Sequence, residues 1–136
     1  MNRFIIKTMA TIKSYTDIEQ SKKLAEILPI ESADMYWDYD VRKHEYYTMV
    51  MDELFDDTCI RAWSLASLLD VLPNNENIST NLSKGGYRIS TLEYTNSWFV
   101  DYEDETNGLN NCVTSADNPV DACYKMIIKL YELKML

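Results

Sequence analysis

Apolar side chains recur at helical spacing most clearly near the end of the chain, over residues 118–133. Asp117 or Asn118 can accept a backbone N–H as N-cap, and Pro119 suits the first helical position because its missing donor would be unpaired there anyway. The apolar positions cover more than half of the helix circumference: Val120, Cys123, Tyr124, Met126, Ile127, Ile128, Leu130, Tyr131 and Leu133. Because so wide an arc exceeds the stripe of a surface helix, we expect this helix to be wedged between layers of the fold, the commoner arrangement, or shared with a partner.

Two earlier segments also have helical periodicity. The first begins at Thr16, where Thr16 and Glu19 match the capping-box pattern, and it stops before Pro29. The second covers residues 61–72, and its middle contains only small serines as polar side chains. Almost no face of this second helix favours water, so we expect it to be the central buried helix, with Trp63 contributing a large buried area.

Aromatic and β-branched residues flank a short polar segment, residues 41–44, and this arrangement predicts a β-hairpin over residues 35–51. Successive side chains of a strand point to opposite faces of the sheet. The side chains of the first strand therefore divide between the two faces. Tyr36, Asp38 and Asp40 lie on one face, and Trp37 and Tyr39 lie on the other.

Strand-like composition returns after residue 77. Gly85 and Gly86 predict a tight turn, because glycine readily adopts the positive φ angles that such turns need. The following residues are typical of strands that reverse at Thr95 and Asn96, and a polar loop over residues 103–116 then leads to the last helix. The order helix, strands, helix, strands, helix predicts an α+β fold, with three helices packed on a mainly antiparallel sheet of hairpins or a meander.

Composition is consistent with one compact domain over residues 1–136, because 46% of the residues are hydrophobic and the length suffices for a core. No apolar run approaches the length of a membrane span, and the first residues lack the features of a signal peptide. Three cysteines, Cys59, Cys112 and Cys123, form no C-x-x-C pair, and their odd number favours reduced thiols. We therefore expect a cytoplasmic protein.

The formal net charge of −9 makes direct binding to a phosphate backbone improbable, since that affinity depends on Lys and Arg. The acidic side chains gather in two stretches of the sequence: Asp52, Glu53, Asp56 and Asp57, and Asp101, Glu103, Asp104 and Glu105. Such clusters are most often solvated surface that keeps a small domain soluble. The alternative is one ordered acidic face that mimics a nucleic acid.

The search for catalytic chemistry is mostly negative. His44 is the single histidine and lies in the predicted hairpin turn, so a nucleophile system would depend on it alone. With only three glycines, neither a P-loop nor a dinucleotide fingerprint can be written. A metal site would require Asp38, Asp40 and His44 to converge across the hairpin, and their spacing is not diagnostic. We therefore expect no catalytic residue, no cofactor and no metal site.

One cluster of aromatic residues is a candidate interaction surface: Tyr36, Trp37, Tyr39, Tyr46 and Tyr47. Packing in the core is the most common role for such residues. A protein interface comes second, because Tyr and Trp are enriched there. A stacking platform for a small ligand is the third interpretation.

Six stretches carry a resemblance to a known group of proteins: Ile12–Tyr15, Ile30–Tyr36, Ala62–Leu65, Leu69–Pro73, Asp117–Tyr124 and Leu130–Leu136. On these stretches the chain resembles a family of small uncharacterised proteins encoded by gut anaerobic bacteria and their prophages or mobile elements. The resemblance implies a phage-related accessory protein, but the family brings no catalytic or binding residues. Its typical opening matches this chain from about Met9, so we expect residues 1–8 to be a poorly ordered N-terminal extension.

Three functions follow as hypotheses. The first is a non-enzymatic interaction protein whose aromatic hairpin or final helix binds another protein, with a second copy of itself among the candidates. The second is an acidic inhibitor, or nucleic-acid mimic, that acts on a DNA-processing protein. The third is a small-ligand-binding protein or an enzyme, which would require a pocket with converging polar groups.

Overall fold

The computed structural model describes residues 13–88, 93–106 and 111–136. These ranges form three α-helices, one short 3-10 helix and two antiparallel sheets of three strands each. The elements are α2 (Ile18–Ile27), η1 (Ile30–Ser32), β1 (Met35–Asp40), β2 (Glu45–Val50), β3 (Ile60–Ala62), α3 (Leu65–Val71), β4 (Ile78–Arg88), β5 (Glu93–Asp104), β6 (Cys112–Ala116) and α4 (Pro119–Glu132). The fold is α+β, as predicted, but its strands divide into two sheets, ordered β2-β1-β3 and β4-β5-β6, rather than one. The predicted extension, residues 1–8, lies outside the described residues.

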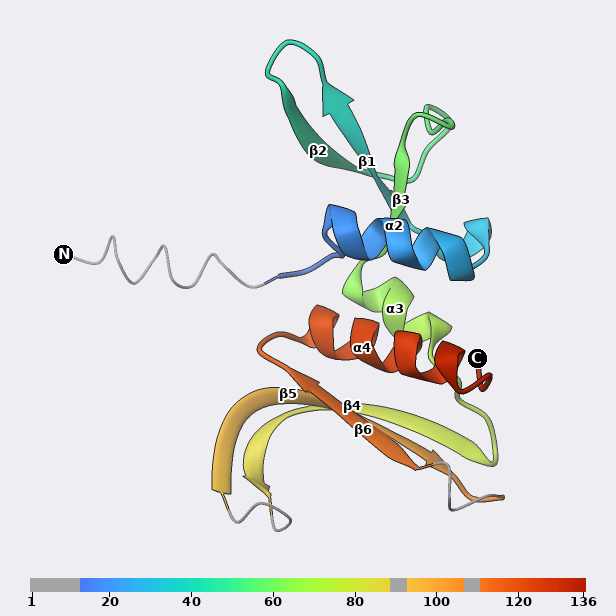
Figure 1. Ribbon diagram of the computed structural model, residues 1–136, viewed down its shortest axis with the longest axis vertical. Helices are drawn as coiled ribbons and strands as arrows, with labels where there is room; N and C mark the ends of the chain where they lie inside the picture. Colours follow the sequence, from blue (N-terminus) through green and yellow to red (C-terminus); the bar gives the residue numbers. More distant parts are fainter. Residues whose placement is uncertain (1–12, 89–92, 107–110) are drawn as a thin grey trace, which may run out of the picture.

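Helix α4 lies between the sheet β4-β5-β6 on one side and the helices α2 and α3 on the other (Figure 1). The predicted wedge is therefore the observed arrangement. Of the two candidate caps, Asn118 is the N-cap: its side chain accepts the backbone N–H of Asp121 at 2.9 Å, and Pro119 follows in the first turn. The α4 side chains that are fully buried in this core are Val120, Ala122, Cys123, Met126, Ile127 and Leu130.

Asp121 ties the beginning of α4 to α2 and to the segment before it. Its carboxylate accepts hydrogen bonds from Gln20 at 2.7 Å and from the Lys13 ammonium at 2.8 Å. Burial alone would raise the pKa of Asp121, but these bonds and one from Asn118 outweigh it, so the pKa lies below its ordinary value. The carboxylate therefore stays ionised and fixes the position of α2 on α4.

Helix α2 begins one residue later than the sequence pattern predicted. Asp17 is the N-cap, and it forms the capping box with Gln20 instead of Thr16 with Glu19. The Thr16 hydroxyl is buried, where it accepts the backbone N–H of Trp63 at 3.1 Å and lies 2.7 Å from the Ser21 hydroxyl. A tertiary contact thus recruits the hydroxyl that a local pattern assigned to the cap. The helix does end before Pro29, as predicted.

The predicted central helix over residues 61–72 is wrong in two respects. Its first residues belong to strand β3, which pairs with Met35–Trp37 of β1, and the helix itself is only α3, capped by Ser64. Within α3 only Leu68 is buried, whereas Leu69 is exposed. Trp63 is fully buried, as expected, but it lies between the strand and the helix. The apolar run therefore supplies a strand and a half-exposed helix, and α4 is the central helix.

In the second sheet, β4 and β5 pair along almost their whole length. Gly85 and Gly86 do have positive φ angles, of 66° and 99°, but they do not form the predicted turn. They lie within β4 at a bulge, where Gly85 stands opposite both Asn96 and Ser97 of β5. Asn96 lies within β5, so the predicted reversal there is also wrong, and the chain connects the two strands through residues 89–92, outside the described residues. Strand β6 occupies part of the predicted polar loop, because it pairs with β5.

Candidate interaction surface

The hairpin β1–β2 extends away from the helices, at the opposite end of the molecule from the second sheet (Figure 1). Its two strands form the predicted hairpin, and their register places Tyr39 opposite Tyr46 and Asp40 opposite Glu45. In the turn, the Asp40 carboxylate accepts the backbone N–H groups of Arg42 and Lys43 at 2.9 and 3.2 Å. This side chain therefore stabilises the turn, and the hairpin has a single defined register.

Two of the predicted surface aromatics anchor the base of the hairpin. Tyr36 is only 2% exposed, its hydroxyl donates to the Asp52 carboxylate at 2.8 Å, and its ring meets Phe55 edge-on. The bond to Asp52, together with burial and nearby acidic groups, raises the pKa of Tyr36 to about 12. The Trp37 indole donates to the backbone carbonyl of Thr16 at 3.0 Å and stacks on Tyr15. These two residues hold the hairpin on the body of the protein.

The other three predicted aromatics are exposed: Tyr39 by 43%, Tyr46 by 44% and Tyr47 by 40%. Tyr39 and Tyr46 face each other across the strands, with ring centroids 5.0 Å apart. Tyr47 points to the opposite face of the hairpin, where its hydroxyl donates to Asp38 at 3.3 Å. Burial first, and then the charge of Asp38, raises the pKa of Tyr47, so the phenol remains neutral and able to donate.

Three aliphatic side chains extend this exposed area, and sequence reasoning did not include them. Val41 and Val50 are each 73% exposed, and Met49 is exposed too. Along β2 every side chain except that of Thr48 is exposed, so this strand faces solvent on both sides. We call the set Tyr39, Val41, Tyr46, Tyr47, Met49 and Val50 the hairpin surface.

The eight predicted acidic residues do not form one face. Asp52, Glu53, Asp56 and Asp57 lie in the loop between β2 and β3, whereas Asp101, Glu103, Asp104 and Glu105 lie in and after β5 of the other sheet (Figure 1). Several of these carboxylates stabilise local turns: Asp56 accepts the N–H and the hydroxyl of Thr58. The two acidic stretches therefore lie on opposite sides of the helical layer.

The structure places His44 and Cys123, two of the residues considered for metal binding or nucleophilic chemistry, in different environments: His44 is exposed and Cys123 is in the core. Within residues 13–88, 93–106 and 111–136, no three His, Cys, Asp or Glu side chains gather at a metal-binding distance. His44 is exposed in the hairpin turn with a positive φ of 53°. Burial raises the pKa of Cys123 to about 12, so this thiol behaves as a small apolar side chain in the core.

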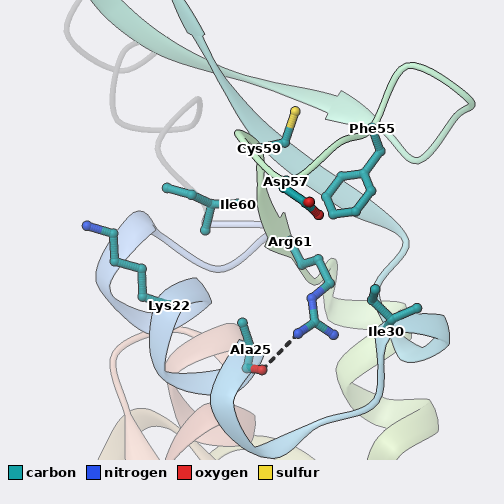
Figure 2. Close-up of a pocket in the computed structure, with 8 residues that line it drawn as sticks. All are labelled: Lys22, Ala25, Ile30, Phe55, Asp57, Cys59, Ile60 and Arg61. Atoms are coloured by element: carbon teal, nitrogen blue, oxygen red, sulfur yellow. Dashed lines mark hydrogen bonds between the residues drawn. The ribbon is translucent and has the colours of Figure 1, made fainter.

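A surface cavity of about 350 Å³ lies beside the hairpin base, between α2, the β2–β3 loop and β3 (Figure 2). Its lining residues are Lys22, Ala25, Ile30, Phe55, Asp57, Cys59, Ile60 and Arg61. The Arg61 guanidinium donates to the carbonyls of Ala25 and Leu28 at 2.8 and 3.3 Å, so it caps the end of α2. This cation is therefore engaged in the fold, where it stabilises the end of α2 beside the cavity.

No family model, curated protein or solved structure matches this chain. The resemblance to proteins of gut anaerobes therefore stays a prediction. Among the described residues, even the longest helix, α4 with 14 residues, is too short to cross a membrane.

Proposed function

We propose that this chain is a non-enzymatic interaction protein that binds another protein through the hairpin surface. One observation carries the proposal: a strand with aromatic and aliphatic side chains is exposed on both faces, beyond the body of the fold. Large apolar side chains that gather on a surface are typical of interaction sites, and Tyr and Met are enriched in interfaces. An accessory role in a prophage or mobile element, as the resemblance implies, and a cytoplasmic location belong to the same proposal.

The anchoring of the hairpin supports this function. Tyr36 and Trp37 fix its base through hydrogen bonds to Asp52 and to the Thr16 carbonyl, and Tyr39 packs on Tyr46 above them. A surface that is already ordered loses less conformational entropy on binding than a disordered loop does. The hairpin surface is therefore suited to present its side chains to a partner.

The final helix is a weaker candidate for the interface. Its wide apolar arc is covered within the same chain, by the sheet β4-β5-β6 and by α3. Tyr131 and Leu133 remain exposed near its end, but they are few and lie apart from the hairpin. The acidic mimic gains no support either, because one acidic stretch lies in the β2–β3 loop and the other lies in and after β5 of the second sheet.

Affinity capture from the organism that encodes the chain tests the proposal. The tagged protein is compared with a variant that combines Tyr39→Ser, Tyr46→Ser and Tyr47→Ser, and with the matched control Tyr131→Ser, which alters an exposed tyrosine on α4. We expect a partner, or a second copy of the chain, to be retained by the wild type and the control. The triple variant should bind about tenfold more weakly or worse, since aromatic residues often dominate interfaces.

Two results would contradict the proposal. One is a partner that the triple variant still binds with unchanged affinity. The other is a wild-type chain that retains neither a partner nor a second copy of itself. Thermal unfolding of each variant verifies that the body of the protein stays folded, and we expect little change because the three rings are exposed.

A further inference from the structure

The outer edge of β2 differs from the other strand edges that the structure describes. Within the described ranges no strand pairs with it, because β2 is the end strand of the order β2-β1-β3. Natural proteins usually protect such edges with lysine, proline, bulges or short length. The six residues of β2 include neither lysine nor proline, and their pairing with β1 has no irregularity.

The remaining edges do have such protection. Strand β3 is only three residues long. Strand β4 has two glycines with positive φ angles, Gly85 and Gly86, at the point where its register with β5 shifts, and Lys84 lies next to them. On β6, the Lys125 ammonium donates to the backbone carbonyl of Ser115 at 2.9 Å. Among the described strand edges, the outer edge of β2 is thus the unprotected one, and β2 is also the strand with exposed aromatic side chains.

We propose that the β2 edge pairs antiparallel with the β2 edge of a second copy of this chain, so that the two three-stranded sheets become one six-stranded sheet. This inference rests on the proposed function and names its partner. Strand addition at a free edge supplies backbone hydrogen bonds, and the alternating side chains supply specificity. Pairing of identical edges about a two-fold axis closes the assembly and leaves no further β2 edge free.

Charge complementarity supports a second copy as the occupant. In a two-fold antiparallel pair, directly opposite residues point to the same face of the sheet, so a residue at the centre faces its own copy. Strand β2 is flanked at one end by the turn that contains Arg42 and Lys43 and at the other end by the loop that contains Asp52 and Glu53. The two-fold axis of the pair can pass at Tyr47 or at Thr48, near the middle of β2. Either register brings the basic turn of one chain to the acidic loop of the other, twice.

The exposure of these charges in the single chain is consistent with this pairing. Arg42 and Lys43 are exposed at the hairpin turn, and Asp52 and Glu53 are exposed just beyond the other end of β2. The oppositely charged groups thus lie beyond opposite ends of the same strand, and antiparallel self-pairing brings such ends together. Without these contacts, two chains of net charge −9 would repel each other.

Sedimentation of the full chain over a range of concentrations tests the proposal. We expect a monomer–dimer equilibrium for the wild type. Variant one combines Arg42→Glu and Lys43→Glu, and variant two is Glu53→Arg. Each variant should weaken self-association by about tenfold or more, because each places like charges next to each other in the dimer. A mixture of the two variants should recover part of the dimer, since the reversed turn of variant one then meets the reversed residue 53 of variant two. The control, Lys22→Glu with Lys23→Glu, changes the net charge as variant one does but on α2.

The control should dimerise as the wild type does. A wild type that stays monomeric at every concentration overturns the proposal, as does a mixture that fails to recover the dimer. If the wild type is monomeric while capture still finds a partner lost from the tyrosine triple variant, the second copy is wrong and the interaction function stands. If that capture also fails, both proposals are wrong.

Discussion

The two sheets of this protein differ in what covers them. The sheet β4-β5-β6 has one face against α4, where Val100 and Tyr102 are buried, and its strands alternate between this face and solvent. The sheet β2-β1-β3 contacts the body only near its base, and its outer strand faces solvent on both sides. Buried side chains therefore concentrate around α4 and exposed apolar side chains concentrate on the hairpin, so the proposed binding surface lies apart from the stable core.

The largest expected effect on stability comes from replacing a leucine by alanine in the core, compared with the same replacement beside the hairpin. Leu130→Ala removes a fully buried side chain from α4, and we expect the free energy of unfolding to fall by about 2–5 kcal/mol. Leu54→Ala, at a site 71% exposed in the loop after β2, should change it by about 0.5 kcal/mol or less. Urea unfolding measures both. Equal losses would show that the two regions do not differ in this way.

A hydroxyl at the junction of the two regions has the next largest effect. Thr16→Val leaves the buried backbone N–H of Trp63 and the Ser21 hydroxyl without this partner, which should cost about 1–3 kcal/mol. Thr48→Val makes the same chemical change on the hairpin, and we expect it to cost about 0.5 kcal/mol or less. Thermal unfolding of both variants distinguishes them. A neutral Thr16→Val would disprove the role of this hydrogen bond.

The smallest effect on stability depends on pH. The Asp34 carboxylate accepts the backbone N–H of Ser64 at 2.9 Å and also its hydroxyl, and so joins the hairpin base to the cap of α3. Burial would raise the pKa of Asp34, but these bonds outweigh it and hold the pKa below its ordinary value. The contribution of the ionised Asp34 carboxylate to the free energy of unfolding is therefore complete above the unfolded-state pKa of about 3.9. It is lost as the pH falls through the lower folded-state pKa.

Replacement of this carboxylate tests that dependence. Asp34→Asn should lower the free energy of unfolding by about 1 kcal/mol at neutral pH. The difference from the wild type should shrink as the pH falls below about 4, since the wild-type carboxyl group then becomes neutral as well. Urea unfolding at a series of pH values measures this. A difference that stays constant down to the acid limit would contradict the assignment.

Local signals were sufficient to predict α4 and the hairpin. Asn118 and Pro119 are a local signal for a helix start, and the structure uses them as such; the polar segment 41–44 between aromatic runs predicts a hairpin turn. The candidate surface was predicted only in part. Tyr36 and Tyr39 lie on one strand and have the same chemistry, and only the loop that carries Asp52 and Phe55 decides that Tyr36 is the buried one.

Features that depend on distant partners could not be predicted. A pair of glycines indicates positive φ angles, but a turn and a bulge both need them, and the pairing of β4 with β5 decides for the bulge. Strand β6 is a strand because β5 lies beside it, and its own composition does not require one. The two acidic stretches are separated because one lies in the β2–β3 loop of the first sheet and the other lies in and after β5 of the second sheet. The number of acidic residues in the sequence does not predict this separation.

Hydrogen–deuterium exchange at increasing chain concentrations tests most directly whether the hairpin is a binding surface separate from the stable body. We expect slow exchange of the α4 amides at every concentration. At β2 we expect fast exchange in dilute solution, and slower exchange as the chain self-associates or when a captured partner is added. Exchange at β2 that remains fast under all of these conditions, or that is already as slow as in α4 when dilute, would contradict it.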